Sequence, residues 1–379
     1  MALFNCYREA TLYLSRIATT SLTPILCSIA HNNSYSTSTS EPLSSTANYL
    51  VSNLGCSQEI ASQVSKHVRF EKPDKSDSVL TLFRSYGFSN SQISQMINAR
   101  PRLLVAKAHK TILPKLEFLR SKGASMSELV HIVSLNPSFL LRSLENCIVP
   151  SYDLFKKIFQ SDERTMELIK RQVSIISDSR VANNAAMLLD DGVPESKVAL
   201  LLLRKPLSVN LQSETFKKVV EEVKELGFNP LKSDFVIALH IKIIMSESSW
   251  KRKIDLFKRW GWSEDAIVSA FSKHPWCMVV SEGKIEKIME FFVISKGWDS
   301  MEIAKYPKLL SYSLQKRILP RVSVIQFLQS NGLIRKNARH YAAFLMPEKL
   351  FVQQYVDSFK DNAPQLLKLY AKEQNVSKK

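Results

Sequence analysis

Apolar residues recur at intervals of three and four along most of this chain, a pattern that predicts amphipathic helices. Many of these stretches end at a glycine, and the residue four positions earlier is apolar, as expected for a helix with a left-handed glycine cap. Eight glycines follow one another at intervals of 32, 36, 69, 35, 34, 36 and 35 residues: Gly55, Gly87, Gly123, Gly192, Gly227, Gly261, Gly297 and Gly332. The interval of 69 equals two periods, so one copy lacks its glycine; only Gly283 is out of phase.

Prolines keep the same period at another fixed phase: Pro101, Pro137, Pro206, Pro275 and Pro307. Their two intervals of 69 imply copies without proline near Gln172 and His240. A proline at this phase ends the preceding helix, because it disfavours the α conformation of the residue before it. Thirteen residues later stand Pro114, Pro150 and Pro320. Each of these is expected to open the next helix.

One unit is therefore a helix, a proline turn, a second helix and a glycine cap. Neither helix can bury its apolar face alone, so neighbouring units must stack. The sequence predicts an all-α, helical-repeat solenoid (a right- or left-handed superhelix) of about eight units of roughly 35 residues. The predicted organisation is a transit peptide over 1–45, a degenerate first repeat and linker over 46–78, repeats over 79–345, and a C-terminal helix and basic tail over 346–379.

The segment Arg100-Pro101-Arg102-Leu103-Leu104, followed by Pro114, Phe118-Leu119 and Gly123, resembles the repeat of the mitochondrial transcription termination factor (mTERF) family, particularly its plant branch. The resemblance covers about 300 residues. It implies a superhelix with a positively charged groove for nucleic acid, and roles in organellar transcription termination or regulation, or in intron splicing. Tetratricopeptide and pentatricopeptide repeats have similar lengths but lack this pair of prolines.

The first forty residues carry one acidic residue, Glu9, beside Arg8 and Arg16, and they end in a run rich in Ser and Thr. Such a composition is typical of an organellar transit peptide. Spaced arginines with bulky apolar neighbours favour the mitochondrion, with the chloroplast as the alternative.

The formal net charge of +17 and the pI of about 9.6 favour a polyanionic partner. The five cysteines form no Cys-x-x-Cys pair, so neither a disulfide framework nor a metal site is expected. We expect no membrane insertion, because no apolar run approaches the ~18 residues of a membrane-spanning helix.

Basic residues recur in phase and form two series. The first stands just before the proline turns, where the helix dipole alone could favour cations. The second opens the following helices, where the dipole disfavours cations, so phosphate binding is the better explanation there. The candidate nucleic-acid-binding residues are Arg100, Arg102, Lys110, Arg142, Arg171, Arg204, Lys205, Lys217, Arg252, Lys273, Lys284, Arg317 and Arg321.

No catalytic motif is present, so we expect neither an enzyme nor a bound cofactor. His131 and His274 are interpreted as core histidines, and the tryptophans near the caps and turns (Trp260, Trp262, Trp276 and Trp298) as core filler instead of base-stacking groups. The predicted function is regulation of organellar gene expression by binding double-stranded nucleic acid, as a monomer. DNA and RNA remain open as targets, RNA processing is the alternative, and a protein-binding scaffold is the alternative of another class.

Overall fold

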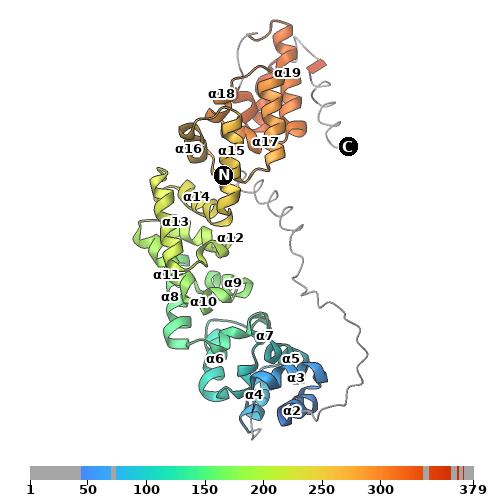
Figure 1. Cartoon of the computed structure of the whole chain (residues 1–379), viewed down its shortest axis with the longest axis vertical. Helices are drawn as coiled ribbons and strands as arrows, with labels where there is room; N and C mark the ends of the chain where they lie inside the picture. Colours follow the sequence, from blue (N-terminus) through green and yellow to red (C-terminus); the bar gives the residue numbers. More distant parts are fainter. Residues whose placement is uncertain (1–43, 70–73, 336–340, 360–364, 367–369, 371–379) are drawn as a thin grey trace. The chain divides into compact units, whose positions relative to one another are not determined.

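The computed structural model describes residues 44–69, 74–335, 341–359, 365–366 and 370. Every regular element in these ranges is a helix, and the chain passes through them in pairs (Figure 1). The all-α class and the helical repeat expected from the sequence are confirmed. The predicted transit peptide lies, except for its last two residues, outside the described residues, as does most of the predicted basic tail.

The first helix of each pair packs on the first helix of the next. These first helices are α3 (Gln58–His67), α5 (Asn90–Ala99), α7 (Met126–Leu135), α9 (Asp162–Arg171), α12 (Glu195–Arg204), α14 (Ser233–Ile244), α16 (Glu264–Lys273) and α18 (Ser300–Lys305). Contacts join α3 to α5, α5 to α7 and α7 to α9, and they continue from α12 through α14 and α16 to α18. This is the nearest-neighbour stacking of a repeat protein.

The second helices contact the first helix of the following pair, for example α6 with α7 and α13 with α14. They are α2 (Ser45–Leu54), α4 (Asp74–Ser85), α6 (Leu113–Ser121), α8 (Val149–Phe159), α11 (Ser179–Asp190), α13 (Ser213–Glu225), α15 (Glu247–Arg259), α17 (Glu282–Met289) and α19 (Leu319–Ser330). The chain continues into α20 (Tyr341–Leu345), α21 (Glu348–Tyr355) and the 3-10 turn η10 (Asp357–Phe359).

The glycine caps form as predicted. All eight in-phase glycines have positive φ, whereas Gly283 does not. At Gly123 the N–H donates to the carbonyl of Arg120, and the next N–H, of Ala124, donates to that of Leu119, which is a Schellman cap. Leu119 is fully buried, as are the apolar residues four before five other caps: Phe83, Leu188, Val223, Phe257 and Leu328. The seventh, Val293, is only half-buried.

The missing glycine has a substitute. Gln160 ends α8 with φ 53°, and it is the one non-glycine residue with positive φ in the described part of the chain. The 69-residue interval therefore contains a helix end at which an L-residue takes the left-handed conformation in place of glycine.

The first helices end at the prolines, as predicted, and a short 3-10 turn follows each of them: η1 (Pro101–Val105), η3 (Pro137–Leu141), η5 (Pro206–Val209), η6 (Pro275–Val279) and η8 (Pro307–Ser311). The residue before the proline is extended, as at Arg100 with φ −143° and ψ 77°. Its carbonyl accepts the N–H three residues on, for example that of Leu103.

The two copies without proline behave differently. Gln172 adopts φ −155° and ψ 81°, and its carbonyl accepts the Ile175 N–H, so the same turn forms before α10 (Ser174–Ser177). At His240 the expected break is absent. Helix α14 continues to Ile244, because no proline interrupts its hydrogen bonds, and the chain enters α15 without a turn.

Three second helices begin earlier than predicted. A π-helical turn precedes each of Pro114, Pro150 and Pro320: η2 (Ala108–Ile112), η4 (Leu144–Ile148) and η9 (Leu314–Ile318). Another π segment, η7 (Glu290–Ser295), follows α17. These prolines therefore lie inside continuous helices. A proline lacks the N–H of a regular turn, and the wider i→i+5 bonding, as from Leu113 N–H to the Ala108 carbonyl, accommodates it.

Candidate nucleic-acid interface

The five proline turns are basic and carry no acid. We define the acid-free turns as residues 99–107, 135–143, 204–212, 273–281 and 305–313, which run from two before to six after each proline. They contain no Asp or Glu and nine cations: Arg100, Arg102, Lys107, Arg142, Arg204, Lys205, Lys273, Lys305 and Lys308. The chain as a whole has 35 acidic residues against 52 Lys and Arg, so this segregation is local.

Successive turns are neighbours in space. The Arg100 Nε donates to Ser138 Oγ at 2.5 Å, which joins the first acid-free turn to the second. His274 Nε2 and Ser311 Oγ, 2.7 Å apart, join the last two, and η6 contacts η8 directly. Where α14 replaces a turn, Ser208 Oγ and His240 Nδ1 lie 2.6 Å apart. Side-chain hydrogen bonds thus join the first two acid-free turns to each other, the last two to each other, and the third to α14.

Within these turns several predicted cations face solvent. Arg100, Arg102, Arg142 and Lys273 are exposed, and no acidic group among the described residues pairs with them. Arg204 is exposed as well. Lys205 is half-buried, and burial, with the adjacent Arg204, lowers the pKa of its ammonium group.

Other members of the first series already have carboxylate partners. Arg171 pairs with Glu167 at 2.5 Å, and Lys170 with Glu128 at 2.5 Å. The hydrogen bond from Lys170, together with those from Ser125, lowers the pKa of Glu128 to about 2. Lys305 pairs with Glu302 at 2.5 Å. A phosphate would have to compete with these acids, so the cations of the acid-free turns other than Lys305 are the better contacts.

Several members of the helix-opening series are buried or half-buried and are engaged inside the fold. Arg321 is fully buried, and its Nη1 donates to the carbonyls of Ala343 and Met346 at 2.7 and 2.8 Å. Its Nη2 pairs with Glu348 at 2.6 Å. Arg317, half-buried, donates to the Met346 carbonyl at 2.7 Å, and Lys284 Nζ to the Ser311 carbonyl at 2.6 Å.

Two further lysines of this series repeat the arrangement. Lys115 Nζ donates to the Leu140 carbonyl and Lys253 Nζ to the Val280 carbonyl, both at 2.6 Å. Leu140, Val280 and Ser311 all lie at the ends of 3-10 turns, where backbone carbonyls lack helical partners. These cations therefore hydrogen-bond to the turn of the next unit, which explains them without phosphate. Burial lowers the pKa of Lys115, Lys253 and Lys284.

Of the helix-opening cations among the candidate residues, three remain at the surface. Lys110 and Lys217 are exposed, and no acidic partner for either lies among the described residues. Arg252 is exposed and lies 3.6 Å from Glu282. The position of a cation within the repeat did not predict whether its side chain is exposed or buried. Exposure is decided by the tertiary structure, because the buried and half-buried side chains are those that reach the backbone carbonyls of the next turn.

Two of the tryptophans near the caps, Trp262 and Trp298, stack on aromatic residues of the core, as expected. Trp262 is buried and stacks on Phe257 with ring centroids 4.5 Å apart, and Trp298 stacks on Phe292 at 4.4 Å. The interpretation of His131 as a core residue is wrong, because its side chain is exposed.

The described residues contain no group of three or more His, Cys, Asp or Glu side chains placed to hold a metal ion. Within the same ranges, no helix combines the length and apolar character that crossing a bilayer requires.

Comparison with known proteins identifies relatives. The mTERF family model matches residues 80–293 and 190–351. Transcription termination factor MTERF15, mitochondrial, of Arabidopsis thaliana is 23% identical over 266 residues, which are 69% of this chain and 50% of that protein. Transcription termination factor MTERF8, chloroplastic, of the same plant is 21% identical over 175 residues, 45% of this chain and 35% of the relative. The chain thus spans half or less of these relatives.

Proposed function

This chain belongs to the mTERF family, and from that premise we propose that it binds organellar nucleic acid through its acid-free turns and so regulates organellar gene expression. The two relatives are named as transcription termination factors of mitochondrion and chloroplast. Control of transcription by binding a duplex is accordingly the proposed mode of action, and RNA processing is the alternative that the binding test below can reveal.

The observation that supports this proposal most strongly is the absence of acids from five basic turns, of which the first two and the last two are joined by side-chain hydrogen bonds. A cation without a carboxylate neighbour is neutralised by mobile counterions, and a phosphate that replaces them releases those ions to bulk solvent. Arg102 and Lys273 meet this condition. Such contacts position a strand without reading its sequence.

A pair of matched variants tests the proposal. The turn variant carries Arg100→Gln, Arg102→Gln, Arg142→Gln and Lys273→Gln. The control variant carries Arg120→Gln, Lys157→Gln, Arg164→Gln and Lys287→Gln, four exposed cations on the helices, outside the acid-free turns. Both variants lose four positive charges, so a general electrostatic effect lowers their affinity equally.

We expect the turn variant to lose at least tenfold more affinity than the control variant for duplex DNA, for structured RNA, or for both. Melting temperatures should stay close to that of the parent, since the substituted side chains are exposed. Preference for RNA would favour the processing alternative. Equal affinities of the two variants would contradict the proposed interface and favour the protein-binding scaffold.

We also propose that residues 1–45 act as a transit peptide. A fusion of these residues to a fluorescent protein should enter mitochondria, and chloroplast import would change only the organelle. Cytosolic or secreted fluorescence would contradict the organellar assignment.

A further inference from the structure

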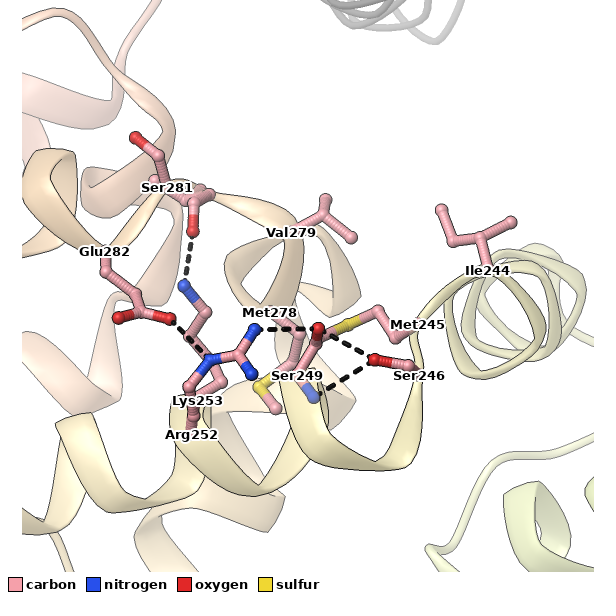
Figure 2. A pocket seen from close by; sticks show the side chains of 11 residues that line it. Ile244, Met245, Ser246, Ser249, Arg252, Lys253, Met278, Val279, Ser281 and Glu282 are labelled. Carbon is pink, nitrogen blue, oxygen red and sulfur yellow. Dashed lines mark hydrogen bonds and ion pairs between the residues drawn. The ribbon is translucent and has the colours of Figure 1, made fainter. Parts of the chain in front are cut away.

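An open cavity of about 480 Å³ lies where α14 passes into α15 without a proline turn (Figure 2). Its lining comes from the junction of these helices, from the turn η6, and from the start of α17. This is one of the two places where the row of acid-free turns is interrupted, the other being the turn at Gln172. Ile244, Met245 and Ser246 of the lining belong to the stretch where the proline turn is missing.

The walls of the cavity are of two kinds. Ile244, Met245, Met278 and Val279 form an apolar side, and Ile244 is 48% exposed. The other lining side chains are mostly polar and come from the first two turns of α15, with its N-cap, and from the start of α17, with Arg252 among them. Such a site fits a ligand that is apolar on one side and anionic on the other.

The polar wall is a connected donor group. Arg252 Nη2 donates to Ser249 Oγ at 3.0 Å, and Ser246 Oγ donates to Ser249 Oγ at 2.9 Å (Figure 2). Lys253 is engaged elsewhere, since it donates to the Val280 carbonyl. Glu282, 3.6 Å from Arg252, is the one carboxylate in the lining. A guanidinium and hydroxyls in this arrangement suit a phosphate oxygen.

We propose that this cavity binds a phosphate group through Arg252 and Ser249, with the apolar wall packed against the sugar that carries the phosphate. This proposal rests on the proposed function. One sugar–phosphate unit of the bound strand occupies the site, and so the strand is also contacted where an acid-free turn is missing. A free phosphate compound offers the same chemistry, and the experiment separates the two sources.

Arg252 has a matched control on its own helix. Arg259 is 66% exposed and lies 3.3 Å from Glu286, while Arg252 is 60% exposed and 3.6 Å from Glu282. The full chain with Arg252→Gln should bind nucleic acid about tenfold more weakly, with a salt slope shallower by about 0.9 on B-DNA. The Arg259→Gln variant should change affinity less than twofold. The Glu282→Gln variant should bind several-fold more tightly, because it removes the carboxylate that competes for Arg252.

A second readout uses inorganic phosphate as the probe. Melting temperatures are compared in phosphate and in chloride at equal ionic strength, for the parent and for Arg252→Gln. Weaker nucleic-acid binding specific to Arg252→Gln supports a backbone phosphate. If phosphate raises the melting temperature of the parent but not of Arg252→Gln, and the two proteins bind nucleic acid equally well, the ligand of the cavity is a free phosphate compound. If Arg252→Gln and Arg259→Gln behave alike in both assays, the cavity is not a phosphate site, while the turn variant still tests the proposed function separately.

Discussion

At the scale of single residues, the direction in which a basic side chain points decides its burial more than its position along the repeat does. Arg321 and Lys316 lie five residues apart at the start of the same helical segment, yet Arg321 is fully buried and Lys316 is exposed. The guanidinium of Arg321 also lies 4.5 Å from the centre of the Phe351 ring. It therefore connects α19 to the C-terminal helices α20 and α21.

Replacing Arg321 by Met should destabilise this C-terminal region. The substitution leaves the carbonyls of Ala343 and Met346 without their donor, and buried polar groups without partners cost about 1–3 kcal/mol each. We expect a loss of about 2–4 kcal/mol in urea unfolding and faster hydrogen exchange in α20 and α21. Lys316→Met, the control, should stay within about 0.5 kcal/mol of the parent. An Arg321→Met protein as stable as this control would contradict the structural role.

Two histidines link stability to pH. Burial, with the charge of Lys205, lowers the pKa of His240 to about 4, and burial, with Lys308, does the same for His274. Unfolded histidines titrate near 6.5. Between pH 6.5 and 4.5 the unfolded chain therefore binds protons that the folded chain excludes, and stability falls as pH falls.

The expected loss is up to about 2 kcal/mol for each histidine across this range. Urea unfolding at pH 7.5, 6.5, 5.5 and 4.5 measures it, and a variant with His240→Gln and His274→Gln should have a flatter profile. Carboxylates such as Glu128 titrate lower, so they act mainly below this range. A parent protein equally stable at pH 6.5 and 4.5 would rule out this linkage.

At the scale of elements, glycine and proline spacing predicted most helix ends, because both residues act through local backbone conformation. The start of the helices at Pro114, Pro150 and Pro320 was not predictable by the same rule. Proline is compatible both with a first helical turn and with a preceding π turn, and only the packed structure distinguishes them. The continuation of α14 past His240 was not predictable either, because the other copy without proline, at Gln172, does end its helix in a turn.

The C-terminal end of α8, where Gln160 has a positive φ, is a place where one substitution should stabilise the protein. An L-residue in the left-handed conformation costs about 1–2 kcal/mol, partly offset by the greater unfolded-state entropy of glycine. Gln160→Gly should therefore stabilise the protein by about 0.5–1 kcal/mol.

Gly123 provides the reverse experiment. It has φ +92°, and no atom lies within 4 Å of an added Cβ, so Gly123→Ala tests the backbone term alone. It should cost about 1 kcal/mol or more. Destabilisation by Gln160→Gly in thermal or urea unfolding would contradict the assignment of Gln160 as a glycine-type cap.

At the scale of the whole molecule, the basic excess divides into two populations. One population is buried: Lys115, Lys253 and Arg321 donate hydrogen bonds to backbone carbonyls of later segments of the chain. The acid-free turns retain exposed cations, among them Arg102 and Arg142, for a partner. The net charge predicted a polyanionic partner, but it could not show which cations are buried and which are exposed. That division depends on which side chains hydrogen-bond to backbone carbonyls of residues distant in the sequence.

The salt dependence of nucleic-acid binding tests the central claim most directly. The logarithm of the affinity for duplex DNA is plotted against the logarithm of salt concentration for the parent and for the turn variant. If between about four and nine of the turn cations contact phosphates, the parent slope should lie between about −4 and −8, and the turn variant should be shallower by about 3 to 4. A parent slope shallower than about −2, or equal slopes for the two proteins, would contradict an interface built from the acid-free turns.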